Sequence, residues 1–130
     1  MAGKGKILLM DDEQIILDVS HEVLKFLGYD VVFAREGSEA VALYKKAQEE
    51  GQPFDLVILD LSISDGMDGR EAIKRLLVVD PNVKAVVSSG YSNDPSMQNF
   101  TEHGFSGRLT KPYRINEIKA MLESMIPKKS

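Results

Sequence analysis

Three carboxylates and one lysine lie directly after short runs that are typical of β-strands: Asp11, Asp12, Asp60 and Lys111. The runs that precede them are Ile7–Met10, Leu56–Leu59 and Gly107–Thr110. A carboxylate just past a buried strand seldom serves packing, because an unpaired charge is costly to bury. If the strands are parallel, their carboxyl ends meet at one edge of the sheet, where open α/β proteins bind ligands. The spacing therefore predicts a small site for a metal ion and a phosphate group.

The chemistry of such a site follows from its oxygen atoms. Carboxylates packed together repel one another and stay ionised only with a cation between them. The ligands would be hard oxygens, which favours Mg²⁺, with Mn²⁺ as a substitute. Asp60 could then attack phosphorus and form an acyl phosphate, while the metal and the Lys111 ammonium offset the charge of the transferring group. Ser88 or Ser89 could hydrogen-bond the phosphoryl group, and strand alternation predicts that only one of them points into the site.

The composition is that of an ordinary globular domain. The chain has 130 residues, of which 43% are hydrophobic and 28% charged, which suits one core. Its net charge of −4 argues against nucleic acid as the main partner. With no cysteine and only His21 and His103, disulfides are excluded and a zinc site is disfavoured. No bilayer-length apolar run or secretory signal is visible, so we expect a cytoplasmic protein without membrane insertion.

Strand patterns alternate with helical patterns along the whole chain. The predicted strands are Ile7–Met10, Val31–Phe33, Leu56–Leu59, Val83–Val87 and Arg108–Thr110. Apolar residues three or four apart mark a helix after each strand. The fourth helix should begin at Asp94-Pro95, carry Met97 and Phe100, and end near Gly104.

This alternation predicts an α/β fold of the flavodoxin-like (βα)5 kind, a doubly wound parallel five-stranded sheet of order 2-1-3-4-5. Strands 1 and 3 are neighbours in that order, so Asp11, Asp12 and Asp60 would converge. We expect a flexible segment at residues 1–5, one domain over residues 6–127 and a tail at residues 128–130.

Each of these residues also has a simpler interpretation. Asp12 could cap the first helix, which taken alone is about as plausible as a metal role. Asp60 could cap the turn that leads to Gly66 and Gly69, and a single lysine such as Lys111 is most often solvated. The functional interpretation depends on the four residues together, each at a predicted carboxyl end of a strand.

In these features the chain resembles the receiver domain of bacterial two-component response regulators over essentially its whole length. The shared marks, in order, are Asp11-Asp12, Asp60, Met67-Asp68-Gly69, Ser89-Gly90 and Lys111-Pro112. The resemblance implies that Asp60 is the phosphoacceptor and that Lys111 pairs with the phosphoryl group. It implies a metal site of Asp11, Asp12, Asp60 and the backbone carbonyl of Ser62. It also implies that Ser89, rather than Ser88, is the switch hydroxyl and that the bond before Pro112 is cis.

Three positions depart from the family pattern. Ser64 stands where the family usually has proline, and the loop from Asp60 to Gly69 is one residue longer than usual. Arg108 stands where an aromatic residue usually moves with the switch hydroxyl. The stretch Ser88–Ser92 is most similar to receivers at the C-terminal end of hybrid sensor histidine kinases.

The resemblance predicts a phosphorylation-dependent signalling switch. A sensor histidine kinase or a histidine phosphotransfer protein would donate the phosphoryl group, and the domain could form a homodimer; its downstream target is not specified by the sequence. The main alternative is a small phosphatase with an aspartyl nucleophile, but Asp11-Asp12-Glu13 differs from the Asp-x-Asp of the haloacid dehalogenase group. A flavin or nucleotide module would meet repulsion from the same acidic residues. A receiver used only for docking would not need Asp12, Asp60 and Lys111.

Overall fold

The computed structural model describes residues 4–126. Its strands are β1 (Lys6–Met10), β2 (Asp30–Ala34), β3 (Leu56–Asp60), β4 (Ala85–Ser89) and β5 (Gly107–Thr110). Its helices are α1 (Gln14–Phe26), α2 (Gly37–Glu49), α3 (Gly69–Val79), α4 (Pro95–Gln98) and α5 (Ile115–Met125), with a 3-10 turn at Phe100–His103. None of these helices is long and apolar enough to cross a membrane.

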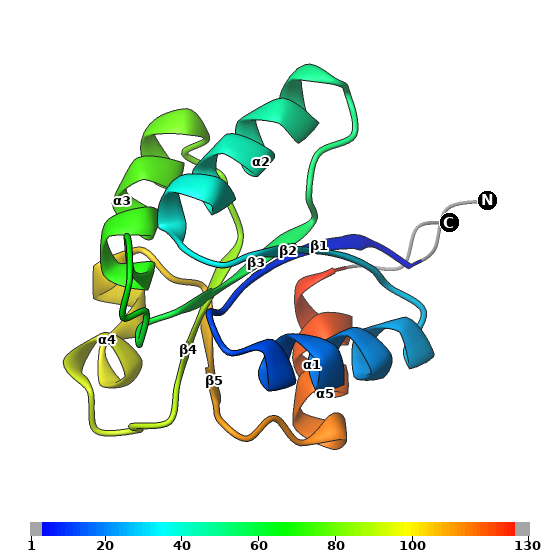
Figure 1. Cartoon of the computed structure of the whole chain (residues 1–130), viewed down its shortest axis with the longest axis vertical. Helices are drawn as coiled ribbons and strands as arrows, with labels where there is room; N and C mark the ends of the chain where they lie inside the picture. Colours follow the sequence, from blue (N-terminus) through cyan, green and yellow to red (C-terminus); the bar gives the residue numbers. More distant parts are fainter. Residues whose placement is uncertain (1–3, 127–130) are drawn as a thin grey trace.

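The five strands form one parallel sheet in the order β2-β1-β3-β4-β5, which confirms the predicted flavodoxin-like architecture (Figure 1). Residues of β3 and β4 are buried throughout, as are those of β1 after Lys6. Strands covered on both faces need apolar side chains at successive positions, which explains the continuous apolar runs in the sequence.

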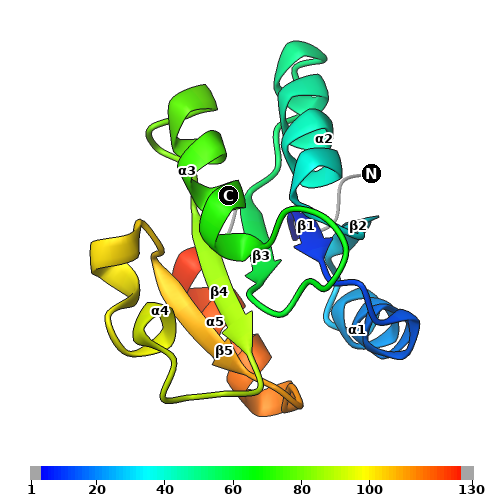
Figure 2. The same ribbon diagram turned by 60° about the vertical axis from the view of Figure 1, so that its left-hand side comes forward.

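Helices cover both faces of the sheet and give the molecule two apolar layers. One face packs under α1 and α5 around Leu17, Leu24 and Leu122, and the other under α2, α3 and α4 around Tyr44, Leu76 and Met97 (Figures 1 and 2). The carboxyl ends of all five strands point to the same edge, because the strands are parallel. The turns at this edge carry the predicted site.

Two elements differ from the sequence predictions. Strand β4 ends at Ser89 rather than Val87, because the hydroxyls of Ser88 and Ser89 both find hydrogen-bond partners inside the protein. The predicted fourth helix is interrupted at Asn99, whose φ of −115° and ψ of 48° are not helical. Its N-terminus is as predicted, since the Asp94 side chain accepts a hydrogen bond from the Ser96 N–H.

The N-terminal end of the described chain is attached to the domain. The Lys4 N–H donates to the Gly28 carbonyl at 2.8 Å, and the Gly5 carbonyl accepts from the Asp30 N–H at 2.9 Å. The remainder of the expected flexible segment, Pro127 and the expected tail at residues 128–130 lie outside the described residues.

Candidate functional site

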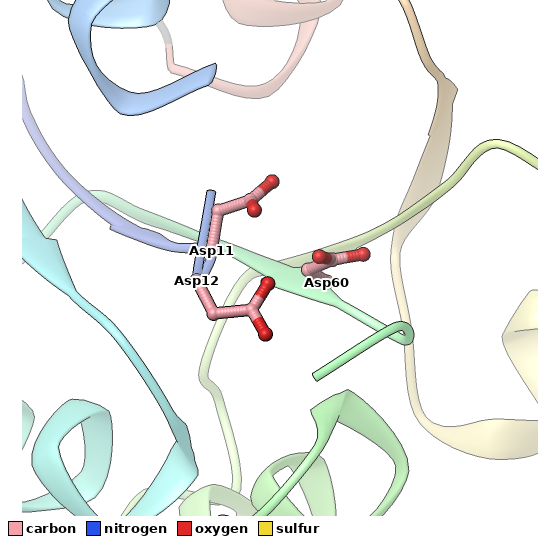
Figure 3. Close-up of side chains that lie close together, drawn as sticks. All are labelled: Asp11, Asp12 and Asp60. Atoms are coloured by element: carbon pink, nitrogen blue, oxygen red, sulfur yellow. The ribbon is translucent and has the colours of Figure 1, made fainter. Parts of the chain in front are cut away.

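Three carboxylates meet where β1 and β3 end. Asp11 and Asp12 follow β1, and Asp60 is the last residue of β3, the neighbouring strand. One oxygen from each side chain lies within 4.8 Å of the others, and the three carboxylates approach one another in Figure 3. Asp11 and Asp60 are fully buried, while Asp12 is partly exposed at the mouth of the site. The convergence that the predicted strand order required is therefore present.

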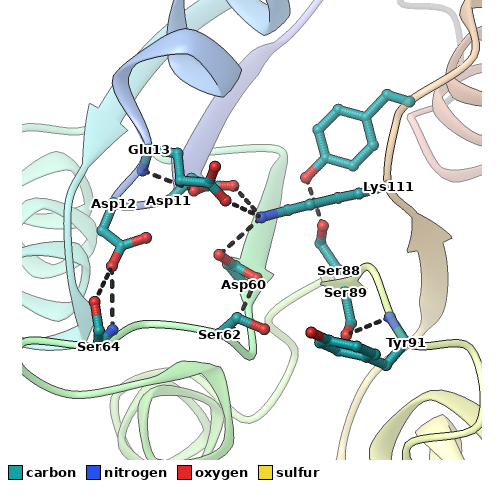
Figure 4. A network of polar contacts seen from close by, with 11 residues as sticks. Asp11, Asp12, Glu13, Asp60, Ser62, Ser64, Ser88, Ser89, Tyr91 and Lys111 are labelled. Atoms are coloured by element: carbon teal, nitrogen blue, oxygen red, sulfur yellow. Dashed lines mark hydrogen bonds and ion pairs between the residues drawn. The ribbon is translucent and has the colours of Figure 1, made fainter.

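The Lys111 ammonium joins two of these carboxylates. Its Nζ lies 2.7 Å from Asp11 Oδ2 and 2.9 Å from Asp60 Oδ2, and the Glu13 carboxylate is 3.8 Å away (Figure 4). The lysine side chain is only 11% exposed, so it is not the solvated lysine of the simpler interpretation. The peptide bond between Lys111 and Pro112 is cis.

Burial and charge shift the pKa values of this pair. Burial raises the pKa of the Asp60 carboxyl above its ordinary value; Lys111 and the Ser62 N–H oppose this, and the Asp11 charge adds to it. Burial lowers the pKa of Lys111, but its hydrogen bonds to Asp11 and Asp60 outweigh this and raise it above the ordinary value. One ammonium thus faces two buried carboxylates, and the site carries an excess of negative charge.

Backbone N–H groups hold each carboxylate in place. Asp11 Oδ1 accepts from Glu13 N–H at 3.0 Å, and Asp60 Oδ1 accepts from Ser62 N–H at 3.1 Å. The second bond is the local turn contact that the simpler interpretation of Asp60 allowed. It leaves Asp60 Oδ2 directed at Lys111.

Asp12 does not cap the first helix. The residue before α1 is Glu13, and its side chain makes no capping hydrogen bond. Asp12 Oδ2 instead accepts from both the N–H and the hydroxyl of Ser64, at 3.1 and 3.0 Å. Ser64, the position at which the family usually has proline, therefore ties the loop after β3 to the acidic cluster.

The donor set fits a small divalent cation. The clustered atoms are carboxylate oxygens, and neither sulfur nor imidazole belongs to the cluster. Buried Asp11 and Asp60 share the Lys111 ammonium, and the partly exposed Asp12 adds a third carboxylate nearby, so a second positive charge would relieve their repulsion. Mg²⁺ commonly takes one or two protein carboxylates and keeps positions for water or phosphate.

The two serines at the end of β4 point to opposite sides of the strand, as alternation predicts. Ser88 Oγ lies 2.5 Å from the Tyr113 hydroxyl, whereas Ser89 Oγ accepts from the Tyr91 N–H at 3.0 Å (Figure 4). Both serines are buried. Ser89 thus lies on the side away from Tyr113, at the strand end next to the Lys111 backbone, whose N–H donates to the Ser89 carbonyl at 2.9 Å.

Glu36 organises the loop after β3, and the sequence contained no signal for this role because glutamate is not a favoured N-cap residue. Its carboxylate accepts from the first-turn N–H groups of Ser38 and Glu39, each at 2.9 Å, and from the Met67 N–H at 3.1 Å. The Gly37 N–H in turn donates to the Met67 carbonyl at 2.7 Å. The loop after β3 is therefore attached to the start of α2.

Arg108 contacts the interrupted fourth helix. Its guanidinium donates to the Met97 carbonyl at 3.1 Å and lies 5.9 Å from the centre of the Phe100 ring. In a continuous α-helix the Met97 carbonyl would accept from the Thr101 N–H. The arginine takes this acceptor instead, which gives a physical reason for the break at Asn99.

The sheet order, the acidic cluster and the lysine agree with a comparison of the chain with known families. The family described as the response regulator receiver domain matches residues 7–123. The chain belongs to the response regulator receiver family. This receiver domain is a signalling phosphoacceptor rather than a classical enzyme, which removes the small phosphatase as an alternative.

Curated relatives include both short and long proteins. The receiver domain is 34% identical over 125 residues to sporulation initiation phosphotransferase F of Bacillus subtilis, covering 96% of each chain. It is 27% identical over 128 residues to the sensor kinase CckA of Brucella abortus, covering 98% of this chain but 13% of that protein. These two relatives place similar domains in different molecular contexts.

A solved structure shares the fold closely. The receiver domain of sensor histidine kinase PA1611 from Pseudomonas aeruginosa PAO1 superposes with a TM-score of 0.81 at 22% identity, covering 94% of this chain and 97% of that one. That structure has a magnesium ion coordinated in its active site cleft.

Proposed function

We propose that Asp60 of this receiver domain accepts a phosphoryl group from a phosphohistidine on a sensor histidine kinase or a histidine phosphotransfer protein. The observation that carries the proposal is the position of Lys111 Nζ, within 2.9 Å of buried oxygens on both Asp11 and Asp60. The arrangement brings the nucleophile, two further carboxylates and the positive charge of Lys111 to one edge of the sheet. This is the set of groups that transfer of a phosphoryl group to a carboxylate requires.

In the proposed reaction an Asp60 carboxylate oxygen attacks phosphorus as the phosphorus–nitrogen bond of the phosphohistidine breaks. The imidazole leaves with the electron pair, and an acyl phosphate forms on Asp60. Lys111 would turn from Asp60 to the new phosphoryl oxygens while remaining paired with Asp11. The Ser89 hydroxyl would contact the phosphoryl group at the end of β4.

Mg²⁺ is the proposed metal, with Asp11, Asp12, Asp60 and the Ser62 carbonyl as its protein ligands. When bound, it would offset charge on the transferring group. The magnesium in the cleft of the PA1611 receiver supports this choice, as does the all-oxygen donor set of the cluster. Ser62 comes two residues after Asp60 in the same turn, where its N–H donates to Asp60 Oδ1.

An apolar groove beside the site supports a protein as the phosphodonor. The groove has a volume of about 250 Å³ and lies between α1 and the start of α5, lined by Ile15, Val19, Val23, Pro112, Tyr113 and Ile118. Ile15 and Val19 are 70% and 58% exposed. Pro112 comes directly after Lys111, so a partner that covered this groove would stand next to Asp60. Two contexts for the domain are supported by its relatives, a short regulator and a receiver within a sensor kinase.

The test is phosphorylation of the purified chain with a small phosphodonor and Mg²⁺, followed by intact-mass measurement. We expect one phosphoryl group per chain, labile to hydroxylamine, and none in Asp60→Asn. Asp65→Asn is the matched control, since Asp65 is an exposed carboxylate in the same loop. Labelling of Asp60→Asn at the wild-type rate would overturn the proposal.

A further inference from the structure

The hydrogen bond between Ser88 and Tyr113 lies on the side of β4 opposite to the Ser89 hydroxyl and close to the turn that carries Lys111. Ser88 is fully buried and is paired in register with Asp60 on the neighbouring strand. Its Oγ lies 2.5 Å from the Tyr113 hydroxyl, two residues after Lys111 (Figure 4). This contact therefore links the strand beside the candidate phosphoacceptor to the turn that carries the lysine.

The backbone attaches the turn between β5 and α5 to the sheet at Lys111, and the Tyr113 ring packs against the apolar layer under α1 and α5. The Lys111 N–H donates to the Ser89 carbonyl, but Pro112 has no N–H to donate. Helix α5 begins at Ile115, and the preceding residue, Arg114, makes no capping hydrogen bond with its side chain. Downstream of Lys111, the Tyr113 hydroxyl is thus a side-chain anchor that attaches this turn to the sheet.

Tyr113 also lies within reach of the charges in the site. Burial raises the pKa of Tyr113 above its ordinary value, Ser88 and Lys111 lower it, and the nearby charges of Asp11 and Asp60 add to the increase. The hydroxyl is therefore neutral at physiological pH and retains its proton for hydrogen bonding. Its ring lines the apolar groove, so one side chain contacts both the groove and the strand next to Asp60.

We propose that Tyr113 is a positioning residue for Lys111. Its bond to Ser88 holds the turn so that the Lys111 ammonium stays between Asp11 and Asp60, where it can meet a phosphoryl group. The effect on rate rests on the proposed function of Asp60, whereas the effect on the position of Lys111 does not. If the Tyr113 hydroxyl were merely structural, removing it would leave the environment of the Lys111 ammonium unchanged.

The first experiment observes the lysine without any phosphodonor. The ¹H–¹⁵N signal of the Lys111 ammonium is recorded by NMR in the wild-type chain, Tyr113→Phe and Ser88→Ala, with Tyr29→Phe as the control. Tyr29 is a buried tyrosine of the layer under α1 and α5. It comes directly before β2, at the edge of the sheet where the strands begin. We expect a changed shift and faster proton exchange in the two test variants and no change in the control. An unchanged Lys111 signal in Tyr113→Phe would refute the positioning role.

The second experiment measures the initial rate of Asp60 labelling by a small phosphodonor at saturating Mg²⁺. Tyr113→Phe and Ser88→Ala should each be roughly three- to tenfold slower, which is the scale of one neutral hydrogen bond. The double variant should be no slower than either single variant, because both remove the same bond. Multiplied losses in the double variant, or a loss in only one single variant, would refute the role of this bond. If the wild-type chain is not labelled at Asp60, the proposed function fails, and the NMR result still decides the position of Lys111.

Discussion

Replacing Glu36 tests how strongly the loop after β3 depends on the start of α2. Glu36→Ala removes the hydrogen bonds to Ser38 and Glu39, a helix N-cap whose loss typically costs about 1 kcal/mol. It also removes the bond to the Met67 N–H, and a bond to a charged acceptor contributes roughly 1.5 kcal/mol at the lower end of its range. The lower end applies because Glu36 is partly exposed. We therefore expect the free energy of unfolding to fall by about 2 to 3 kcal/mol.

The pH dependence gives the same prediction a second measurement. The backbone N–H groups of Ser38, Glu39 and Met67 lower the pKa of Glu36 against the opposing effect of burial. A carboxyl whose folded-state pKa is depressed stabilises the fold fully above its unfolded value, about 4.3, and loses this contribution as the pH falls through the folded value. The difference between wild type and Glu36→Ala should thus be full at neutral pH and shrink under acid conditions.

Urea unfolding followed by far-ultraviolet circular dichroism measures both effects. Glu49→Ala is the matched control, because Glu49 is an exposed glutamate at the other end of α2. The reasoning is refuted if both variants lose equally little stability, or if the Glu36→Ala loss stays constant across the acid range.

Asp60→Asn should raise the free energy of unfolding at about pH 7 in EDTA, because burial raises the folded-state pKa of Asp60 and makes its ionised form costly. This gain in stability should shrink towards about pH 4, and urea unfolding at the two pH values measures it. Mg²⁺ at 100 times its Kd should stabilise the wild-type chain by about 2.7 kcal/mol, and at the same concentration it should stabilise Asp12→Asn much less. Calorimetry measures this as a shift in Tm, and equal shifts in the two chains would contradict the metal assignment. Gly69→Ala would place a Cβ 2.8 Å from the Asp60 carbonyl oxygen and should cost about 1 to 3 kcal/mol in chemical denaturation, whereas Gly90→Ala, which meets open space, should be nearly neutral.

The fold and the convergence of the acidic residues could be predicted because they depend on patterns along the chain. Continuous apolar runs before Asp11 and Asp60 predict buried parallel strands, and the handedness of the crossovers leaves few sheet orders. Once β1 and β3 are neighbours, their end residues must meet. The position of Lys111 followed from the same rule.

The remaining features depend on contacts between distant side chains. Nothing near Glu36 in the sequence indicates Met67 as its partner, and nothing near Tyr113 indicates Ser88. The break in the fourth helix was missed for the same reason. Asp94-Pro95 is a good helix start, but the helix length depends on Arg108, which comes from a later strand.

The interrupted fourth helix has a consequence for where the molecule opens first. A helix of four residues gains little from its own backbone hydrogen bonds, so its order depends on the Asp94 cap, buried Met97 and the Arg108 contact. The eleven-residue α3 has far more hydrogen bonds of its own. Native-state hydrogen exchange should therefore find the segment between β4 and β5 among the least protected parts of the chain. A rearrangement at the carboxyl end of β4 would therefore meet little resistance in this segment. A small change in free energy at that strand end could shift the segment from one conformation to another.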